Sequence, residues 1–295
     1  MVTLKNDKLS IGINTMGAEL TSILNLNTNE EMLWQGDPTY WKRQAPILFP
    51  IVGSVWNNKY IYNGITYEMS QHGFARDMEF TLVSNDEQTA VFELQSSEAT
   101  KKMYPADFVL QISYTLIDNT VKVGWLVSNK NEKDIMHFQI GAHPAFNYKG
   151  YNPDADIQGW LSLRPIDFTY RLSKITEKGC ISNDITEIKY DNEYHDIAIK
   201  KDTFKDDALI LEDSQTSHIT LLDANRVPYL RMIFDAPVVG LWSPRKDEYA
   251  PFVCIEPWYG RCDTVGYDGE FAHRDWMLHL NPQESFRTSY IITIL

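Results

Sequence analysis

Short segments in which apolar and polar residues alternate follow one another along most of the chain. Phe108–Ile117 alternates in this way, and Thr120–Asn129 repeats the pattern after an Asp-Asn turn. Because successive side chains of a strand point to opposite faces of a sheet, these two segments predict an antiparallel hairpin. A second hairpin is predicted at Lys59–Met69, where Asn-Gly separates two arms rich in tyrosine and isoleucine.

Further strands are predicted at Thr89–Ser97, Ser217–Asp223 and Ser289–Leu295. Helical periodicity is rare, and only Ser97–Pro105 predicts one or two helical turns. The chain from the 150s to the 190s is rich in turn residues and is interpreted as mainly loops. No linker or repeat divides the sequence. We therefore predict an all-β protein whose residues 1–295 form one large antiparallel β-sandwich domain, with two smaller β domains as the alternative.

The composition narrows the possible partners. The 295 residues carry a net charge of −13, which argues against nucleic acid because phosphate binding needs a basic surface. No segment has the length and apolarity of a membrane helix, and the first residues lack the apolar core of a signal peptide. The three cysteines follow no CxxC spacing, so neither a disulfide framework nor a cysteine-based zinc site is expected. We expect a soluble cytoplasmic protein, monomeric or homodimeric.

The aromatic content suits a sugar-binding protein. Aromatic residues make up 13% of the chain, with 8 Trp and 16 Tyr, and such rings both favour strands and stack on the flat faces of sugars. The sequence has no GxGxxG after a strand, no GxxxxGK[ST], no HExxH and no GxSxG. Nucleotide-dependent transfer, zinc proteolysis and α/β-hydrolase chemistry therefore lack their usual sequence support, and no cofactor is expected.

Two segments place an ionisable residue between an apolar strand and a proline. His143 precedes Pro144 in "QIGAHPAFN", and Glu256 precedes Pro257 in "FVCIEPW". Because proline cannot donate a ladder hydrogen bond, we expect each strand to end just past the ionisable residue, which then faces a cavity. A base and an acid placed together in this way form a catalytic signature. A third segment, "SQHGFARD", carries His72 beside a glycine turn.

Other interpretations of these residues stay open. Glu256 could form a salt bridge with Arg261, and His72 could be structural. A metal held by His72, His143 and Glu256 is another alternative, although the usual pair of histidines a few residues apart is missing. The other histidines are interpreted as satisfied core or interface residues; they are His137, His195, His218, His273 and His279.

Several motifs, in one order along nearly the whole chain, resemble the aldose 1-epimerase (galactose mutarotase-like) superfamily, and most of all its bacterial LacX-type branch. They are "MGAELTSILN" (Met16–Asn25), "LWQGDPTYWKRQAPILFPIVG" (Leu33–Gly53), "QHGFAR" (Gln71–Arg76), "GAHPAFN" (Gly141–Asn147), "FVCIEPW" (Phe252–Trp258) and "HLNPQESFRTSYIITI" (His279–Ile294). The resemblance implies a large β-supersandwich with a sugar pocket on one concave sheet, and no metal.

The resemblance also implies roles for individual residues. Glu256 would be the general base, His143 the general acid, and His72 a ligand that orients the sugar. Asp207 in "DDALIL" would contact the sugar, and Arg76 and Arg43 resemble arginines that contact a sugar phosphate. Asn58 and Ser54 stand where the family has a sugar-binding arginine, which leaves the identity of the sugar open. The candidate aromatic walls are Trp242, Trp258, Phe146 and Phe74.

The expected function is interconversion of the α and β anomers of a hexose or hexose phosphate. The expected partner is thus a small-molecule sugar or sugar phosphate, and neither nucleic acid nor a membrane. Three other classes are kept as alternatives. A glycoside hydrolase would need two carboxylates beside the scissile bond, and a non-catalytic sugar-binding protein would have no use for an acid–base pair. The third is a structural or regulatory protein that retains the fold.

Overall fold

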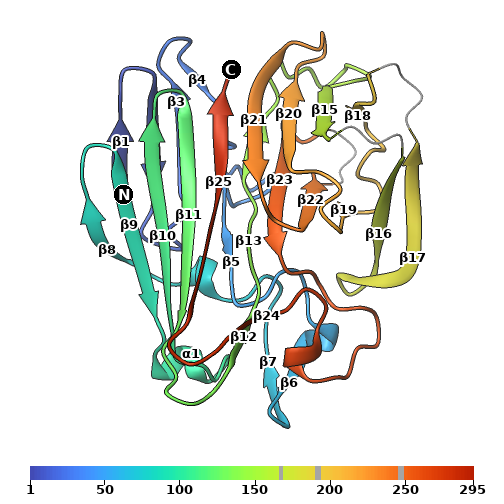
Figure 1. Cartoon of the computed structure of the whole chain (residues 1–295). Helices are drawn as coiled ribbons and strands as arrows, with labels where there is room; N and C mark the ends of the chain where they lie inside the picture. The colour runs from blue at the N-terminus through green and yellow to red at the C-terminus, as the bar shows by residue number, and fades with distance from the viewer. Residues whose placement is uncertain (166–168, 190–193, 245–248) are drawn as a thin grey trace.

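The chain folds almost entirely into β-strands, as a computed structural model shows (Figure 1). The structure describes residues 1–165, 169–189, 194–244 and 249–295. One short α-helix, α1 (Glu98–Lys101), and three single turns of 3-10 helix, η1 (Trp56–Asn58), η2 (Ala75–Asp77) and η3 (Phe271–His273), are the helical elements of this part. The prediction of an all-β protein is confirmed. None of the described helices is long or apolar enough to span a bilayer.

A nine-stranded antiparallel sheet forms one layer. Its strands lie in the order β18-β15-β20-β21-β25-β11-β10-β9-β8. Their bounds are β8 (Thr81–Asn85), β9 (Thr89–Gln95), β10 (Phe108–Ile117), β11 (Thr120–Asn129), β15 (Gly159–Arg164), β18 (Ile197–Ile199), β20 (His218–Leu222), β21 (Pro228–Phe234) and β25 (Ser285–Ile294). The predicted hairpin is confirmed, because β10 pairs with β11 along its whole length. Buried and partly exposed residues alternate strictly along β10 from Phe108 to Leu116, as the sequence pattern requires.

An eight-stranded antiparallel sheet carries the candidate site. Its main path runs β17-β16-β19-β22-β23-β13-β5, and β14 pairs with β23 beside that path. The bounds are β5 (Ile47–Leu48), β13 (Ile140–Ala142), β14 (Ala145–Asn147), β16 (Thr169–Glu177), β17 (Cys180–Lys189), β19 (Leu209–Leu211), β22 (Val238–Trp242) and β23 (Phe252–Tyr259).

Three smaller sheets complete the fold. The first has the order β1-β2-β3-β4, and the others are the hairpin β6-β7 and the pair β12-β24. The hairpin joins Lys59–Tyr62 to Ile65–Glu68 through Asn63-Gly64, as predicted. The remaining bounds are β1 (Val2–Lys5), β2 (Leu9–Ile13), β3 (Leu20–Asn25), β4 (Glu30–Glu31), β6 (Lys59–Tyr62), β7 (Ile65–Glu68), β12 (Met136–Phe138) and β24 (Leu278–Leu280).

The helical turn predicted after Ser97 is confirmed and is short for a local reason. Ser97 and Thr100 form a reciprocal capping box at the start of α1, which satisfies two free N–H groups. The interpretation of the 150s to 190s as mainly loops is wrong, because β15, β16 and β17 lie there. The residues of β17 between Asn183 and Glu187 are all exposed, so no apolar face marked this edge strand in the sequence.

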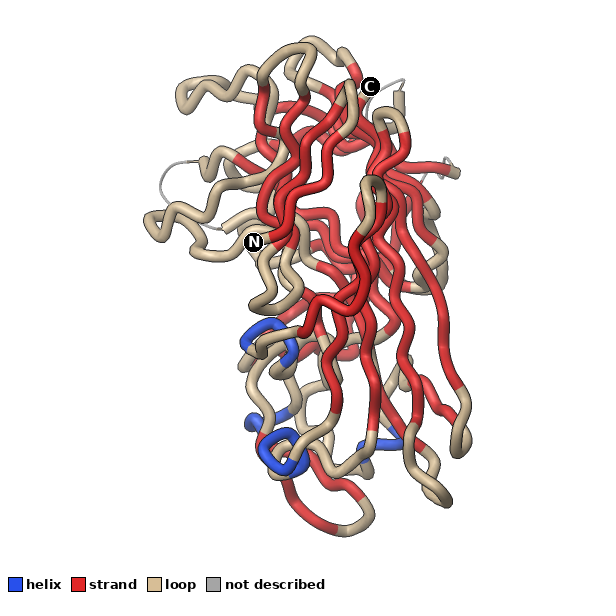
Figure 2. Tube along the Cα trace, turned by 90° about the vertical axis from the view of Figure 1, so that its left-hand side faces the viewer, coloured by secondary structure: helices blue, strands red, loops and turns tan. Residues whose placement is uncertain are grey.

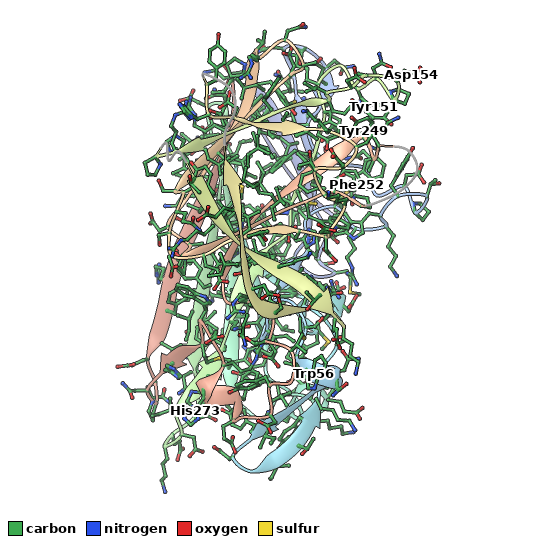
Figure 3. All side chains as sticks on the ribbon, turned by 90° about the vertical axis from the view of Figure 1, so that its right-hand side faces the viewer. Trp56, Tyr151, Asp154, Tyr249, Phe252 and His273 are labelled. Carbon is green, nitrogen blue, oxygen red and sulfur yellow. The ribbon has the colours of Figure 1, made fainter. Side chains whose placement is uncertain are left out.

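The largest apolar core includes buried residues from Leu4 to Ile294 and lies between the two large sheets. It receives Val253 and Ile255 of β23 as well as Leu110 and Ile112 of β10. Figure 2 shows the strands running through the molecule and the few helical turns gathered toward one end. Figure 3 shows Tyr151 and Tyr249 toward the opposite end from Trp56 and His273. That the chain is a single domain stays a prediction.

Candidate functional site

Strand β23 is apolar because both faces of its sheet are covered. Val253 and Ile255 point into the main core, whereas Trp258 packs in a second apolar cluster on the other face, and Cys254 packs in a third. Side chains of a strand alternate, so Glu256 lies on the same face as Cys254 and Trp258. The carboxyl group is therefore part of the second face of the sheet, away from the core between the layers.

The expectation that Pro257 ends the strand is wrong. β23 continues to Tyr259, and Pro257 pairs with Val239 of β22. On the other side of β23, the ladder is interrupted between β13 and β14, where Pro144 lies. The Ile255 N–H points to that side and bonds the Pro144 carbonyl oxygen at 3.3 Å. The backbone nitrogen of Pro257 faces the same side as that of Ile255. Because the ladder is already interrupted there, the N–H that a proline lacks has no strand partner to lose.

This register brings the two ionisable residues together. The antiparallel pairing sets Ile140 against Tyr259 and Ala145 against Cys254, which places His143 directly opposite Glu256. Directly opposed residues share one face and have neighbouring side chains. The His143 Nε2 lies 3.2 Å from the Glu256 Oε2, with side-chain exposures of 9% and 1%. The predicted acid–base pair is thus built as a cross-strand pair.

The pair lies in an environment that favours neutral groups. Burial raises the pKa of Glu256 well above its ordinary value, and the charge of Asp207 adds to this. Burial lowers the pKa of His143 to about 3, with a contribution from the positive charges of Arg76 and Arg43. Both shifts favour the neutral forms of the empty site, a carboxylic acid and an uncharged imidazole.

Three polar atoms of the pair make no hydrogen bond to any described residue, although the Glu256 Oε2 lies 3.2 Å from the His143 Nε2. Neither oxygen of Glu256 makes a hydrogen bond, and the Nδ1 of His143 makes none either. A buried polar group without a partner costs roughly 1–3 kcal/mol. The same atoms are available to a ligand in the cavity beside them.

His72 lies next to His143, with ring centroids 5.5 Å apart. The Nδ1 of His72 accepts a hydrogen bond from the backbone N–H of Gly53 at 3.1 Å. This bond places the proton of the neutral ring on Nε2. Burial, followed by the charges of His143 and Arg76, lowers the pKa of His72 well below its ordinary value. His72 is therefore a neutral side chain that offers a hydrogen-bond donor.

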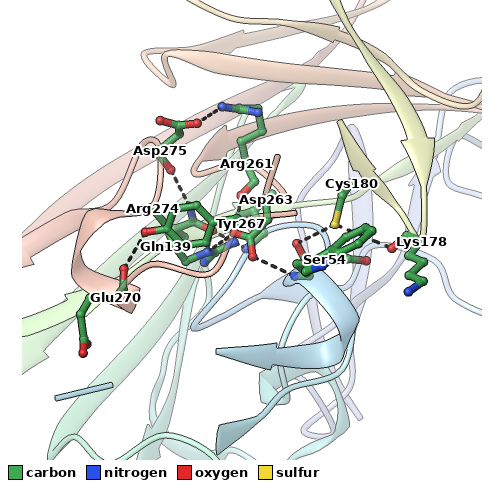
Figure 4. Close-up of polar contacts among 12 residues, drawn as sticks. Ser54, Gln139, Lys178, Cys180, Arg261, Asp263, Tyr267, Glu270, Arg274 and Asp275 are labelled. Carbon is green, nitrogen blue, oxygen red and sulfur yellow. Dashed lines mark hydrogen bonds and ion pairs between the residues drawn. The ribbon is translucent and has the colours of Figure 1, made fainter. Parts of the chain in front are cut away.

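A network of buried polar side chains fixes the segment that holds His72 (Figure 4). Asp263 accepts hydrogen bonds from the Nε of Arg274 at 2.5 Å and from the backbone N–H of Trp56 at 2.8 Å. Gln139 accepts from Arg274 at 3.2 Å and from the backbone N–H of Val52 at 3.0 Å, so both ends of the segment Val52–Trp56 are held. Since Gly53 belongs to this segment, the network holds the partner of His72 in place.

Tryptophans form the walls around the pair. Trp41 stacks on the ring of His143 with centroids 4.7 Å apart and an angle of 28° between planes. Trp242 meets the same ring edge-on at 5.5 Å. Trp258 lies flat against the sheet between Gly141 and Gly240, where a Cβ would stand 2.7 and 2.6 Å from its ring atoms. Glycine is required at both positions because only a bare backbone leaves room for the indole.

These residues surround a cavity of about 270 Å³. The cavity lining includes both members of the pair and the predicted residues His72, Arg76, Asp207, Trp242 and Trp258. Its volume is near the lower end of the roughly 300–1,000 Å³ typical of small-molecule sites. Three further cavities share Asp207 with it. The site is thus a small polar and aromatic pocket with neighbouring cavities beside Asp207.

Other predicted residues lie elsewhere. Arg43 is absent from the cavity lining and forms an ion pair with Asp77 at 2.8 Å. Asn58 lines one of the neighbouring cavities rather than the main cavity. Phe74 and Phe146 are buried in the main core, so they are not walls of the pocket.

The alternative salt bridge from Glu256 to Arg261 is not formed. Arg261 pairs instead with Glu212 at 3.1 Å and with Asp275, a contact that Figure 4 also shows. Arg76, by contrast, reaches the main cavity, and its guanidinium bonds the Gln71 carbonyl oxygen at 2.6 Å. Burial and the charge of Arg43 lower the pKa of Arg76 to about 10.

Sequence reasoning missed Trp41 in the pocket lining and several residues that pack beside the pocket. Trp41 was only one tryptophan of a longer motif, and nothing local marked it as the partner of His143. Gly141 and Gly240 interrupt apolar strands, a pattern that indicates close approach of another group. The sulfur of Cys254, a His143 nitrogen and a Glu256 oxygen all lie within 4.8 Å of one another. Among the described residues these three form a donor set of the kind that can hold a metal ion.

The family model described as aldose 1-epimerase matches residues 1–273. The chain is 31% identical to the plasmid-encoded protein LacX of Lactococcus lactis subsp. lactis over 301 residues, which is 100% of this chain and 99% of LacX.

Two solved structures are also similar. A galactose mutarotase-like protein from Lactobacillus casei has a TM-score of 0.93 at 30% identity, covering 100% of both chains. A galactose mutarotase related enzyme from Lactobacillus acidophilus has a TM-score of 0.91 at 32% identity, covering 100% of this chain and 97% of the other. The chain belongs to the aldose 1-epimerase family.

Proposed function

We propose that the protein interconverts the α and β anomers of a hexose or hexose phosphate. The observation that carries the proposal is the buried pair of His143 and Glu256, 3.2 Å apart, in a pocket walled by tryptophans. Mutarotation needs one proton taken from the anomeric hydroxyl and one given to the ring oxygen. A pair that holds one proton supplies both functions without a metal or a covalent intermediate.

The proton positions allow a closed cycle. With the sugar bound, the Glu256 carboxylate takes the proton of the anomeric hydroxyl, and protonated His143 gives its proton to the ring oxygen. The ring opens to an aldehyde, and the pair is left as a carboxylic acid and a neutral imidazole. After rotation about the C1–C2 bond, the two transfers run backwards and close the ring on the other face. The pair starts and ends with the same single proton.

Without a sugar, the pocket favours the carboxylic acid with the neutral imidazole over the carboxylate with the imidazolium. Burial favours protonated Glu256 and neutral His143, which is the form that accompanies the open-chain sugar. Sugar binding must therefore move the proton from Glu256 to His143 across their 3.2 Å contact. Hydroxyl groups of the sugar can stabilise this ion pair by hydrogen bonding to the carboxylate, because a charged group gains more from such bonds.

The neighbouring residues position the sugar. His72 offers its Nε2 hydrogen, and Trp258 and Trp242 provide flat apolar surfaces for the carbon-bound face of the ring. Each positioned proton transfer contributes roughly 10²–10⁴-fold to the rate. Asp207 lies across the cavity and is the acceptor proposed for a sugar hydroxyl.

Glycoside hydrolysis is the second candidate, because Asp207 and Glu256 place two carboxyl groups in one cavity. Saturation-transfer NMR separates the candidates on glucose, galactose, their 6-phosphates and a disaccharide. Mutarotation transfers saturation between anomeric protons and gives no product. Hydrolysis gives new reducing ends, and a binding protein gives line broadening alone. Absence of catalysed exchange for every sugar would overturn the proposal.

A further inference from the structure

Directly behind the acid–base pair lies a thiol that the sugar chemistry does not use. Cys254 precedes Glu256 by two residues on β23, so both side chains are on one face of the sheet. Its sulfur is fully buried and does not line the cavity. The sulfur, a nitrogen of His143 and an oxygen of Glu256 lie within 4.8 Å of one another.

These distances suit a small tetrahedral cation. Ligand atoms that bind zinc at 2.0–2.3 Å lie roughly 3.3–3.6 Å from one another. The Nε2 of His143 and the Oε2 of Glu256 are already 3.2 Å apart, and the sulfur needs only a short approach. Neither Glu256 oxygen has a hydrogen-bond partner among the described residues, although this side chain is 1% exposed. Within the described part of the chain, the only contact that the carboxylate would exchange for a cation is therefore the 3.2 Å contact with His143.

The chemistry of the donors selects the cation. Thiolate and imidazole are ligands of zinc and related transition metals, whereas magnesium and calcium require more oxygen donors than this site offers. The thiolate of Cys254 and the carboxylate of Glu256 bring two negative charges, which neutralise a divalent ion in the buried site. The positive charge of Arg76, which lines the same cavity, opposes the cation.

We propose that Cys254, His143 and Glu256 form a binding site for a thiophilic divalent cation such as Zn²⁺, and that the bound cation blocks the acid–base pair. The thiol proton of Cys254 and the carboxyl proton of Glu256 are both released to solvent as these two groups bind the cation. Three protein ligands leave a fourth position open toward the cavity, for water or a sugar oxygen. Binding occupies the His143 and Glu256 lone pairs that proton exchange requires, so the cation inhibits catalysis.

Cobalt titration tests the site without relying on activity. Co²⁺ added to the metal-free wild-type protein should bind with one equivalent per chain and give a sulfur-to-cobalt charge-transfer band in the near ultraviolet. Cys254→Ala should abolish the band and weaken binding at least about 100-fold, above the roughly 10–100-fold typical for loss of a supporting residue. Cys262→Ala is the matched control, because this cysteine also lies in the cavity wall but outside the donor set.

The outcomes separate the possibilities. A band that disappears in Cys254→Ala and persists in Cys262→Ala supports the site. No band in the wild type, an equal band in Cys254→Ala, or a band lost in Cys262→Ala alone overturns it. If Cys254→Ala is misfolded by circular dichroism, Cys254→Val serves in its place, because the surroundings are apolar. Failure to find anomer exchange would contradict the proposed function and leave the cobalt result standing.

Discussion

A methyl group added at Gly240 should push Trp258 out of its place and into the pocket. Gly240 pairs with Glu256 on the neighbouring strand, and its backbone lies against the six-membered ring of the indole. A Cβ there would stand 2.6 Å from Cη2 and 2.7 Å from Cζ2 of Trp258. Ordinary carbon contacts are about 3.5–4.0 Å, so the ring must move by roughly 1 Å.

The magnitude follows from how tightly the indole is held. Trp258 is 4% exposed, and Gly141 confines it on the other neighbouring strand. Overpacking of this kind costs about 1–3 kcal/mol of unfolding free energy. A displacement of about 1 Å at a wall of the site can lower kcat/KM up to about 100-fold. Gly240→Ala should therefore lower both quantities, measured by urea denaturation and by saturation-transfer NMR.

Two variants make the test specific. Gly12→Ala is the control, because this strand glycine lies outside the pocket and its added Cβ would come no closer than 3.3 Å to a neighbouring atom. Trp258→Phe removes the outer ring atoms that meet the new methyl group. In that background Gly240→Ala should cost at least about 1 kcal/mol less than in the wild type, a coupling within the range for contacting residues. Strictly additive effects, or an unchanged Gly240→Ala protein, would refute the packing argument.

Further predictions concern the charged groups of the pocket. Glu256→Gln should lower the rate of anomer exchange at least about 100-fold, and a near wild-type rate would rule out its role. The same variant should become more stable relative to the wild type as pH rises above 4.5, by about 1.4 kcal/mol per unit of raised pKa, because folding favours protonated Glu256 and this contribution is lost as pH rises through the folded pKa. An unchanged difference in unfolding free energy between pH 5 and 8 would contradict this. The rate should stay level below pH 6.5, since the pKa of His143 is lowered to about 3, and fall at alkaline pH when the pair loses its proton; an acid limb centred near pH 6.5 would count against it. Arg76→Ala should reduce kcat/KM more for a hexose 6-phosphate than for the free hexose, with Arg43→Ala, outside the cavity lining, as the control; equal loss on both sugars would assign Arg76 a structural role.

The sequence alone was sufficient to predict the strands that have one buried and one exposed face. β10 and β11 alternate because one face is buried, and the Asn63-Gly64 turn dictates its own hairpin. β17 escaped prediction because its exposed middle carries no apolar face, and the pairing with β16 is what makes it a strand. A local pattern predicts a strand only where one face of the strand meets the solvent and the other meets the core.

The candidate site was predictable in its chemistry and not in its geometry. The two ionisable residues before prolines indicated a pair, yet their opposition depends on a register between segments more than 100 residues apart. The same pattern misplaced the strand end, because a proline is tolerated inside β23 where the neighbouring ladder is interrupted. The charge states of the pair could not be predicted from the sequence either, since the pKa of His143 depends on burial and on Arg76 rather than on its neighbours in sequence.

The distribution of unsatisfied polar atoms argues that the pocket is made for a ligand rich in hydroxyl groups. Among the described residues, buried atoms without a hydrogen-bond partner include both oxygens of Glu256, the Nδ1 of His143, the Nε1 of Trp258 and the Nε of Arg76. All four residues line one small cavity. Such atoms destabilise a fold by roughly 1–3 kcal/mol each. Others lie outside this cavity, at Trp125 and Arg261 for example, but five of them gather here, which stability alone does not explain. A sugar can act as both donor and acceptor at every hydroxyl group, and it presents an apolar face to the indole as well. The most apolar strand of the chain thus carries a carboxyl group because burial keeps one proton within a pair whose remaining bonds are left for the substrate to complete.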